Sequence, residues 1–254
     1  MKALSFEIGG KTAFFKKPDV NTYAYFTYNN IHKPALLGLL GAIIGLDGYT
    51  KLFNDNLGLK KKDLTFNDGF PSYYEKLKDL QISIIPLAKN GYFSKKIQVF
   101  NNSVGYASFE QGGNLIIREQ WLENPKWQII ILDDESLEFT KLKDCLLNSK
   151  AHFIPYLGKN DHPAIIKNVK EIKLSKDIYN KDEIFIDSLF IENQEIDGFA
   201  RGDEIPFKFS EFSPVSLQKD LHFYKYEKLC FTNLELEQIP ENTYSYEGKN
   251  YTFI

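Results

Sequence analysis

Residues 34–46 read Pro-Ala-Leu-Leu-Gly-Leu-Leu-Gly-Ala-Ile-Ile-Gly-Leu. The stretch is apolar on nearly all sides, and a proline suits the first turn of a helix. Gly38, Gly41 and Gly45 fall at i, i+3 and i+7 and therefore share one face. Glycine costs up to about 1 kcal/mol per site inside a helix, so this face indicates a close approach to a sheet or a neighbouring backbone. We predict a buried core helix here.

The patterns on both sides of this helix predict an α+β fold. Strands are expected at 2–8, 81–87, 127–132 and 168–174, and an amphipathic helix at 136–148 with Ser136 as its N-cap. Without the polar segment at about 88–120, the order is βαββαβ, which is the ferredoxin-like pattern. We predict a ferredoxin-like domain over residues 1–174, in which 88–120 form a protruding β-hairpin. The alternative for that segment is a plain exposed loop.

The last third of the chain differs from the rest in pattern and in charge. Residues 175–254 alternate in short runs with few helical signals, which predicts a β-rich C-terminal extension. Residues 181–254 hold 15 acidic and 7 basic side chains, whereas residues 1–180 hold 19 acidic and 24 basic ones. Because salt screens charges beyond about 10 Å, an acidic chain with a net charge of −3 can still present a basic face.

Composition excludes several classes of protein. The net charge of −3 argues against a free-standing binder of duplex DNA, which would be strongly basic. Two distant cysteines, Cys145 and Cys230, exclude a disulfide-stapled scaffold and a four-cysteine zinc site. The four histidines have no metal-ligand spacing, so we expect no metal and no cofactor. The N-terminus has no signal-peptide core, and the longest apolar stretch is shorter than the roughly 20 residues that cross a bilayer. We expect a cytoplasmic protein without a membrane partner.

Motifs for nucleotide-dependent and nucleophilic enzymes are missing: the sequence has no GxGxxG after the first strand, no GxxxxGK[ST] and no GxSxG. Metal-free RNA cleavage stays open, because it needs only a general base, a general acid and a cation. His32 and Lys33, near Tyr23, Tyr25 and Tyr28, supply these groups. A lone histidine is more often structural, so a metal-independent endoribonuclease is the alternative to a non-catalytic protein.

Lysines and aromatic rings are interleaved over residues 11–33. Proteins bind single-stranded RNA through phosphate contacts and through bases stacked on rings, at roughly 1–3 kcal/mol per base. A ferredoxin-like sheet is one of the architectures used for this. Arginine, which reads guanine edges in a groove, occurs only as Arg118 and Arg201. The pattern therefore favours RNA held by its backbone, although some of the rings, such as Phe14 or Phe15, are expected in the core.

Four segments together resemble one family. They are Gly9-Gly-Lys-Thr-Ala-Phe-Phe-Lys-Lys17 after the opening strand, Ile31-His-Lys-Pro34 running into the glycine helix, Arg118-Glu-Gln-Trp-Leu-Glu-Asn-Pro-Lys-Trp127, and Pro155-Tyr-Leu-Gly-Lys-Asn-Asp-His-Pro-Ala164. In this order they are similar to the CRISPR-associated family-five proteins, subunits of the type I interference complex (Cascade), and nearest to the type I-B branch. The resemblance covers roughly residues 1–174 and is looser beyond.

The resemblance implies an RRM-like, RAMP-type ferredoxin fold whose hairpin is a thumb. It implies a subunit that caps crRNA by gripping its 5′ handle and meets target DNA only through the complex. The expected neighbours are the repeated backbone subunit and the large subunit of Cascade. In the type I-C branch the family itself cleaves RNA with a tyrosine, a lysine and a histidine. The Lys-His pair of that branch is not evident here, where His32-Lys33 has the reverse order. A scaffold with protein contacts only is a third possibility.

The resemblance also places the candidate RNA-binding residues. Lys16, Lys17, Tyr28, His32 and Lys33 lie in the N-terminal motif, where handle phosphates would be met. The predicted thumb carries Lys89, Lys95, Lys96 and Arg118, and the glycine turn carries Gly158, Lys159 and His162. Backbone N–H groups in such a turn can approach a phosphate closely; the alternative for Gly158 is a tight turn only.

Overall fold

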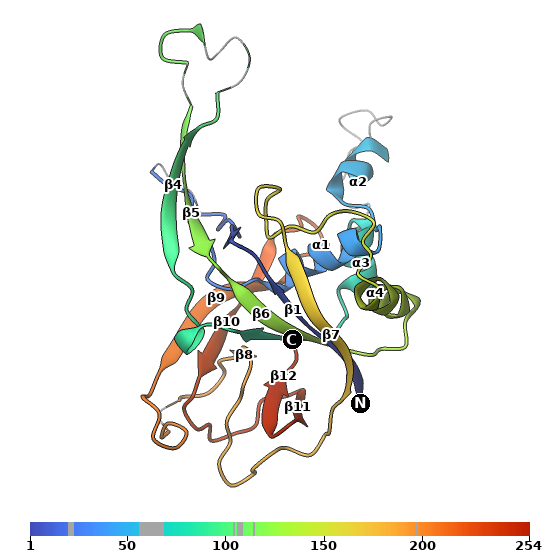
Figure 1. Cartoon of the computed structure of the whole chain (residues 1–254), viewed down its shortest axis with the longest axis vertical. Helices are drawn as coiled ribbons and strands as arrows, with labels where there is room; N and C mark the ends of the chain where they lie inside the picture. The colour runs from blue at the N-terminus through green and yellow to red at the C-terminus, as the bar shows by residue number, and fades with distance from the viewer. Residues whose placement is uncertain (20–22, 56–68, 104, 106–108, 114, 197) are drawn as a thin grey trace.

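A four-stranded antiparallel sheet forms the centre of the molecule (Figure 1). The computed structural model describes residues 1–19, 23–55, 69–103, 105, 109–113, 115–196 and 198–254. The sheet has the order β3-β6-β1-β7 and consists of β1 (Lys2–Gly9), β3 (Ile82–Pro86), β6 (Lys126–Leu132) and β7 (Ile165–Lys173). Helices α1 (Lys33–Ile43) and α4 (Leu137–Leu147) connect β1 to β3 and β6 to β7. This arrangement confirms the predicted ferredoxin-like topology.

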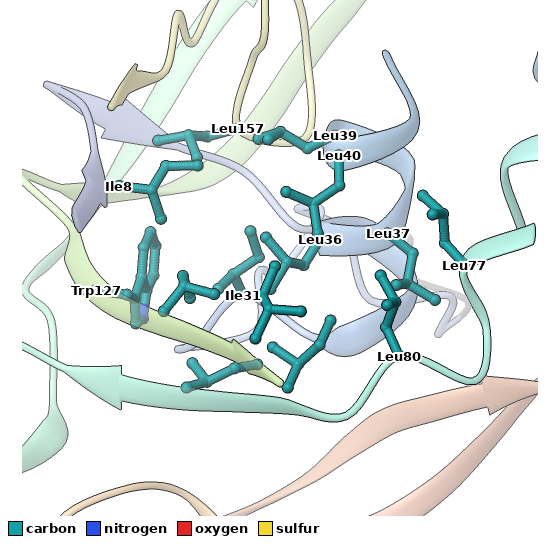
Figure 2. Packing of buried hydrophobic residues seen from close by; sticks show 14 of the residues in the cluster. Ile8, Ile31, Leu36, Leu37, Leu39, Leu40, Leu77, Leu80, Trp127 and Leu157 are labelled. Carbon is teal, nitrogen blue, oxygen red and sulfur yellow. The ribbon is translucent and has the colours of Figure 1, made fainter. Parts of the chain in front are cut away.

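The core lies between this sheet and α1. Side chains alternate along β1, so that Leu4, Phe6 and Ile8 face the helix and are fully buried. Leu36 and Leu40, one turn apart on α1, pack toward Ile8, Trp127 and Leu157 (Figure 2). Burying one leucine fully stabilises a fold by about 1.5–3 kcal/mol, so the apolar helix is a main source of stability, as its sequence predicts.

Two short helices follow α1: α2 (Tyr49–Asp55) and α3 (Ser72–Leu77). The close approach that the glycines indicate is made to α3 and not to the sheet. A Cβ added at Gly41 would lie 2.5 Å from the Cβ of Tyr73, whereas one at Gly38 would meet only the Tyr73 ring, at 3.7 Å. Gly45 is not part of the helix, which corrects the expected run of three glycines. It follows the C-terminus of α1 at a φ of +76°, a conformation that favours glycine.

The two helical glycines give a matched pair of variants. Gly38→Ala should raise the free energy of unfolding by about 0.5–1 kcal/mol, because alanine is the better helix former and its methyl group has room. Gly41→Ala should lower it by about 1–3 kcal/mol, because the methyl group overlaps Tyr73. Urea denaturation shows whether each variant raises or lowers the free energy of unfolding. Equal effects at the two positions would contradict the packing of α1 against α3.

The far face of the sheet is covered by the end of the chain. The hairpin β11 (Thr243–Tyr246) and β12 (Lys249–Thr252) brings Tyr251 and Phe253 against Ala3, Ile130 and Ile172. Ile254 exchanges main-chain hydrogen bonds with Ile82, and the Leu189 N–H donates to the Ile84 carbonyl. The C-terminal residue and the residue before β8 thus cover the outer edge of β3. At this end of the sheet, the open face that an RRM uses for stacking bases is therefore occupied.

A second sheet, in the order β8-β10-β9, belongs to the C-terminal extension. It consists of β8 (Phe190–Ile191), β9 (Lys208–Leu217) and β10 (Tyr224–Thr232). The β-rich character of this region is as predicted, but β9 was not expected from the sequence. Leu189, Leu217 and Leu229 are buried in the same core as α1. The division of the chain at residue 174 stays a prediction, since both parts share that core.

The third sheet forms the protruding hairpin. Strands β4 (Lys95–Asn101) and β5 (Ile116–Glu123) pair antiparallel and extend away from the body (Figure 1), after a short 3₁₀ turn η1 (Lys89–Gly91). Strand β2 (Thr12–Ala13) pairs with the base of β5. The prediction of a hairpin is therefore confirmed over the strands that the structure describes, and we call β4 and β5 the thumb.

Candidate nucleic-acid interface

The N-terminal loop returns along the base of the thumb. The Tyr25 N–H donates to the Arg118 carbonyl and the Gln120 N–H donates to the Tyr25 carbonyl, both at 2.8 Å. Lys16 forms an antiparallel bridge with Thr27 inside the same loop. These main-chain bonds fix an irregular segment against β5, so that residues more than 90 positions apart in the sequence form one surface.

Cations lie over tyrosine rings on this surface. The Lys16 Nζ is 3.8 Å from the Tyr25 ring centroid, the Lys95 Nζ is 3.9 Å from that of Tyr92, and the Arg118 guanidinium is 5.0 Å from that of Tyr23. Tyr23 and Tyr92 are 74% and 52% exposed. We call these residues the thumb-base surface: Lys16, Tyr23, Tyr25, Tyr92, Lys95 and Arg118. A surface with exposed rings next to cations offers both stacking for a base and a partner for a phosphate.

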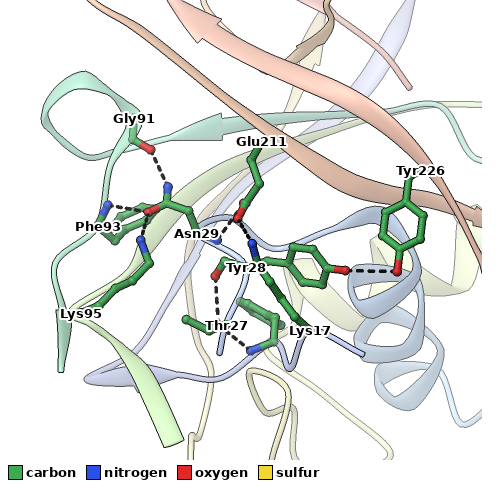
Figure 3. Close-up of polar contacts among 10 residues, drawn as sticks. Lys17, Thr27, Tyr28, Asn29, Gly91, Phe93, Lys95, Glu211 and Tyr226 are labelled. Carbon is green, nitrogen blue, oxygen red and sulfur yellow. Dashed lines mark hydrogen bonds and ion pairs between the residues drawn. The ribbon is translucent and has the colours of Figure 1, made fainter. Parts of the chain in front are cut away.

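Asn29 ties the thumb-base surface to the rest of the fold (Figure 3). Its side-chain Nδ2 donates to the Gly91 carbonyl at 2.8 Å, and its Oδ1 accepts from the Phe93 N–H at 3.2 Å and from the Lys95 Nζ at 2.9 Å. The Asn29 N–H donates to Glu211 of β9 at 2.8 Å. One buried asparagine therefore joins the N-terminal loop, the base of the thumb and the C-terminal extension.

Sequence reasoning missed this role, because no local motif singles out Asn29. Asn30 is equally structural: its Oδ1 accepts from the Trp127 Nε1 at 2.9 Å. The partners of both asparagines are more than 60 residues away, so a local pattern carries no signal for them.

Replacing Asn29 should destabilise the protein strongly. Asn29→Ala leaves the Gly91 carbonyl and the Phe93 N–H without their buried partner, at about 1–3 kcal/mol each. We expect the free energy of unfolding in urea to fall by about 3 kcal/mol. Asn102→Ala, at an exposed position of the thumb, is the control and should change it by less than about 0.5 kcal/mol. A decrease of similar size in both variants would contradict the central role of Asn29.

Several candidate lysines are paired with carboxylates. The Lys17 Nζ is 2.9 Å from Glu211, the Lys159 Nζ is 2.9 Å from Glu119, and the Lys96 Nζ is 3.8 Å from Glu123. Lys96 points to the face of β4 opposite to that of Lys95, because neighbouring strand residues alternate. Lys89 is exposed in η1. Of the candidates, Lys17 and Lys95 line one hollow at the base of the thumb. Lys16 and Arg118 lie over Tyr25 and Tyr23 of the loop that runs along β5, and the Lys159 Nζ lies over the Phe100 ring.

His32 is structural and not part of this surface. It is the N-cap of α1, and its Nδ1 accepts from the Ala35 N–H at 3.2 Å. Its ring is buried against Phe15, Tyr28 and Tyr224, at centroid distances of 5.2–6.1 Å. Burial lowers the pKa of His32 to about 3. The ring is therefore neutral at physiological pH and shielded from RNA, which weighs against a ribonuclease that uses it.

Three further candidates also lie inside the fold. Lys33 is buried and its Nζ donates to the Ile254 carbonyl at 3.0 Å, and burial lowers its pKa to about 8. His162 is fully buried: its Nδ1 shares a 2.6 Å hydrogen bond with the Thr12 hydroxyl, and burial lowers its pKa. Tyr28 is 2% exposed, and its hydroxyl donates to that of Tyr226 at 3.3 Å. These side chains are therefore enclosed by the fold.

Gly158 serves packing in the structure. Its φ is +89°, and any Cβ there would overlap the Phe14 carbonyl, because the Phe14 N–H donates to the adjacent Leu157 carbonyl at 3.1 Å. This packing agrees with the alternative from the sequence, in which Gly158 only allows a tight turn. In the described ranges no group of three or more His, Cys, Asp or Glu side chains is placed to hold a metal ion. No helix built from the described residues is long and apolar enough to cross a membrane.

The pKa of His32 makes stability dependent on pH. The neutral ring is favoured in the folded state and the charged ring in the unfolded state below the ordinary pKa of about 6.5. The stability that comes from burying the neutral His32 ring is therefore fully present above pH 6.5 and is lost as pH falls from 6.5 toward 3. His32→Asn keeps an N-cap acceptor but does not titrate. Between pH 6 and 4.5, the free energy of unfolding should fall by about 1.4 kcal/mol per pH unit more in the wild type than in this variant.

Comparisons with known proteins show the fold. No family model matches the sequence, and no curated protein matches it. A chain of a solved CRISPR RNA-guided surveillance complex is similar at a TM-score of 0.52 and 11% identity, with 94% of this chain and 91% of that chain covered. The chain shares its fold with CRISPR-associated proteins.

Two other solved structures are similar at lower scores. A CRISPR protein from Archaeoglobus fulgidus has a TM-score of 0.48 and 12% identity, over 99% of this chain and 98% of that one. A chain of the type III-B Cmr-beta complex bound to cognate target RNA has a TM-score of 0.40 and 11% identity, over 92% and 84%. Membership of family five and of the type I-B branch stays a prediction from the sequence motifs.

Proposed function

We propose that the chain is a non-catalytic subunit of a CRISPR ribonucleoprotein complex and holds single-stranded crRNA on the thumb-base surface. The observation that carries this proposal is the placement of Lys16, Lys95 and Arg118 over tyrosine rings at the foot of a protruding hairpin. Such a surface suits RNA held by its phosphates with bases stacked on rings. The likeness of fold to a chain of an RNA-guided surveillance complex supports the same assignment.

The finer assignment rests on the sequence resemblance. According to this finer assignment, the chain caps the 5′ handle of crRNA in a cytoplasmic type I-B Cascade. Its neighbours in that complex are the repeated backbone subunit and the large subunit, and target DNA is reached only through the assembled complex. The burial of His32 removes the residue on which the ribonuclease alternative depended.

Binding would exchange partners at the paired lysines. The Lys17 side chain is 29% exposed and that of Glu211 is 15% exposed, so this ion pair is only partly open to water. A phosphate can take the place of the carboxylate at Lys17, because Glu211 keeps its hydrogen bond from the Asn29 N–H. Glu119 likewise has a second partner, since it accepts from the Trp121 Nε1 at 2.8 Å.

Neutralising the two N-terminal lysines tests this function. In the double variant Lys16→Gln, Lys17→Gln the side chains stay polar and of similar reach but carry no charge. We expect affinity for 5′-handle RNA to fall roughly tenfold at physiological salt, and the slope of log K against log salt to shrink by about 0.7 for each phosphate that the variant no longer neutralises. Fluorescence anisotropy over a salt series measures both quantities.

The matched control is Lys141→Gln with Lys143→Gln on α4, away from the thumb (Figure 1). It removes the same charge from the chain and should leave the salt slope unchanged. An equal decrease in both double variants would mean that only net charge matters. Unchanged affinity in the Lys16, Lys17 variant would overturn the proposed surface.

A further inference from the structure

A cavity of about 820 Å³ is lined by residues of α1, of the segment before β7 and of the connection from β9 to β10. Its size falls within the roughly 300–1,000 Å³ of small-molecule sites. Small residues of α1, Ala35, Gly38 and Ala42, line one side. Its other sides carry the rings of Tyr49, Tyr73, Phe153, Tyr156, His222 and Tyr224. We call it the ring cavity.

The lining of the ring cavity is aromatic and uncharged. Its described lining residues include no Asp, Glu, Lys or Arg. Phe153 and Tyr156 are 54% and 44% exposed, so their rings are open to a ligand. The His222 Nε2 is shielded from solvent and has no hydrogen-bond partner among the residues that the structure describes. A planar, uncharged heteroaromatic ring fits such a lining, because it can stack on the rings and offer one hydrogen bond.

The segment that lines the ring cavity continues into a lysine, because Gly158 lines the cavity and the next residue is Lys159. The Lys159 Nζ is bonded to Glu119, which does not line the cavity. An uncharged aromatic hollow of this kind suits the base of a nucleotide whose phosphates stay outside.

We infer that the ring cavity receives an unpaired base of the bound RNA, stacked among Phe153, Tyr156 and the neighbouring tyrosines. The phosphates on either side of this base stay outside the cavity. This inference rests on the RNA-binding function proposed above. An apolar side chain of a partner protein is the competing occupant, and a comparison of two RNA probes separates the two.

The test compares a short oligoadenylate with an abasic ribose-phosphate oligomer of the same length and charge. For each protein the ratio of the two affinities reports base binding. In Phe153→Ala with Tyr156→Ala, the ratio should fall about tenfold, since stacking contributes roughly 1–3 kcal/mol per base. Affinity for the abasic oligomer should stay at the wild-type value. Gly38→Leu, which fills the cavity instead of removing rings, should lower the ratio in the same way.

Two controls separate this inference from the function on which it rests. Ile154→Ala changes an 83% exposed residue of the same loop that does not line the cavity, and should leave the ratio unchanged. Lys16→Gln with Lys17→Gln should weaken both oligomers by the same factor. If the wild type binds both oligomers and the cavity variants keep its ratio, the base site is wrong while RNA binding stands; a protein-docking cavity would give that result. If the wild type binds neither oligomer, both proposals fall.

Discussion

The buried side chain of Asn29 is the contact on which the candidate interface depends. It is bonded to the Gly91 carbonyl, the Phe93 N–H and the Lys95 Nζ, and its own N–H is bonded to Glu211. Since an unpaired buried polar group costs about 1–3 kcal/mol, this network strongly disfavours a displaced loop. The loop therefore stays against β5, and the rings and cations of the thumb-base surface keep their places.

The electrostatics of the surface follow from two kinds of cation, those that lie over tyrosine rings and those that face carboxylates. Lys16, Lys95 and Arg118 lie over tyrosine rings, which leaves their charges able to meet a phosphate. Lys17 and Lys159, each about one third exposed, instead face the carboxylates of Glu211 and Glu119. An acidic chain thus presents a local basic surface, and the C-terminal extension contributes Glu211 as a counter-charge next to it.

Local patterns predicted the framework well. The alternation in β1, the apolar run of α1 and the N-cap Ser136 of α4 depend on neighbours a few residues apart, and each is present in the structure. Local patterns carry no signal where distant partners decide burial. The resemblance makes His32 and His162 candidates for RNA binding, yet both side chains are buried and contact segments that lie far away along the chain. The strand β9 was missed because its pairing with β10, and not its own pattern, makes it a strand.

By itself, the amino-acid sequence determined the βαββαβ order, the hairpin and the concentration of lysines and rings near the N-terminus, because periodicity and composition act over a few residues. Only the tertiary structure decided which of those side chains reach solvent. It buried Tyr28, His32, Lys33 and His162, placed Lys16, Lys95 and Arg118 over tyrosine rings, and formed the ring cavity from four separate segments. The physical reason is that burial depends on what packs against a residue, and these neighbours are brought together only by the fold.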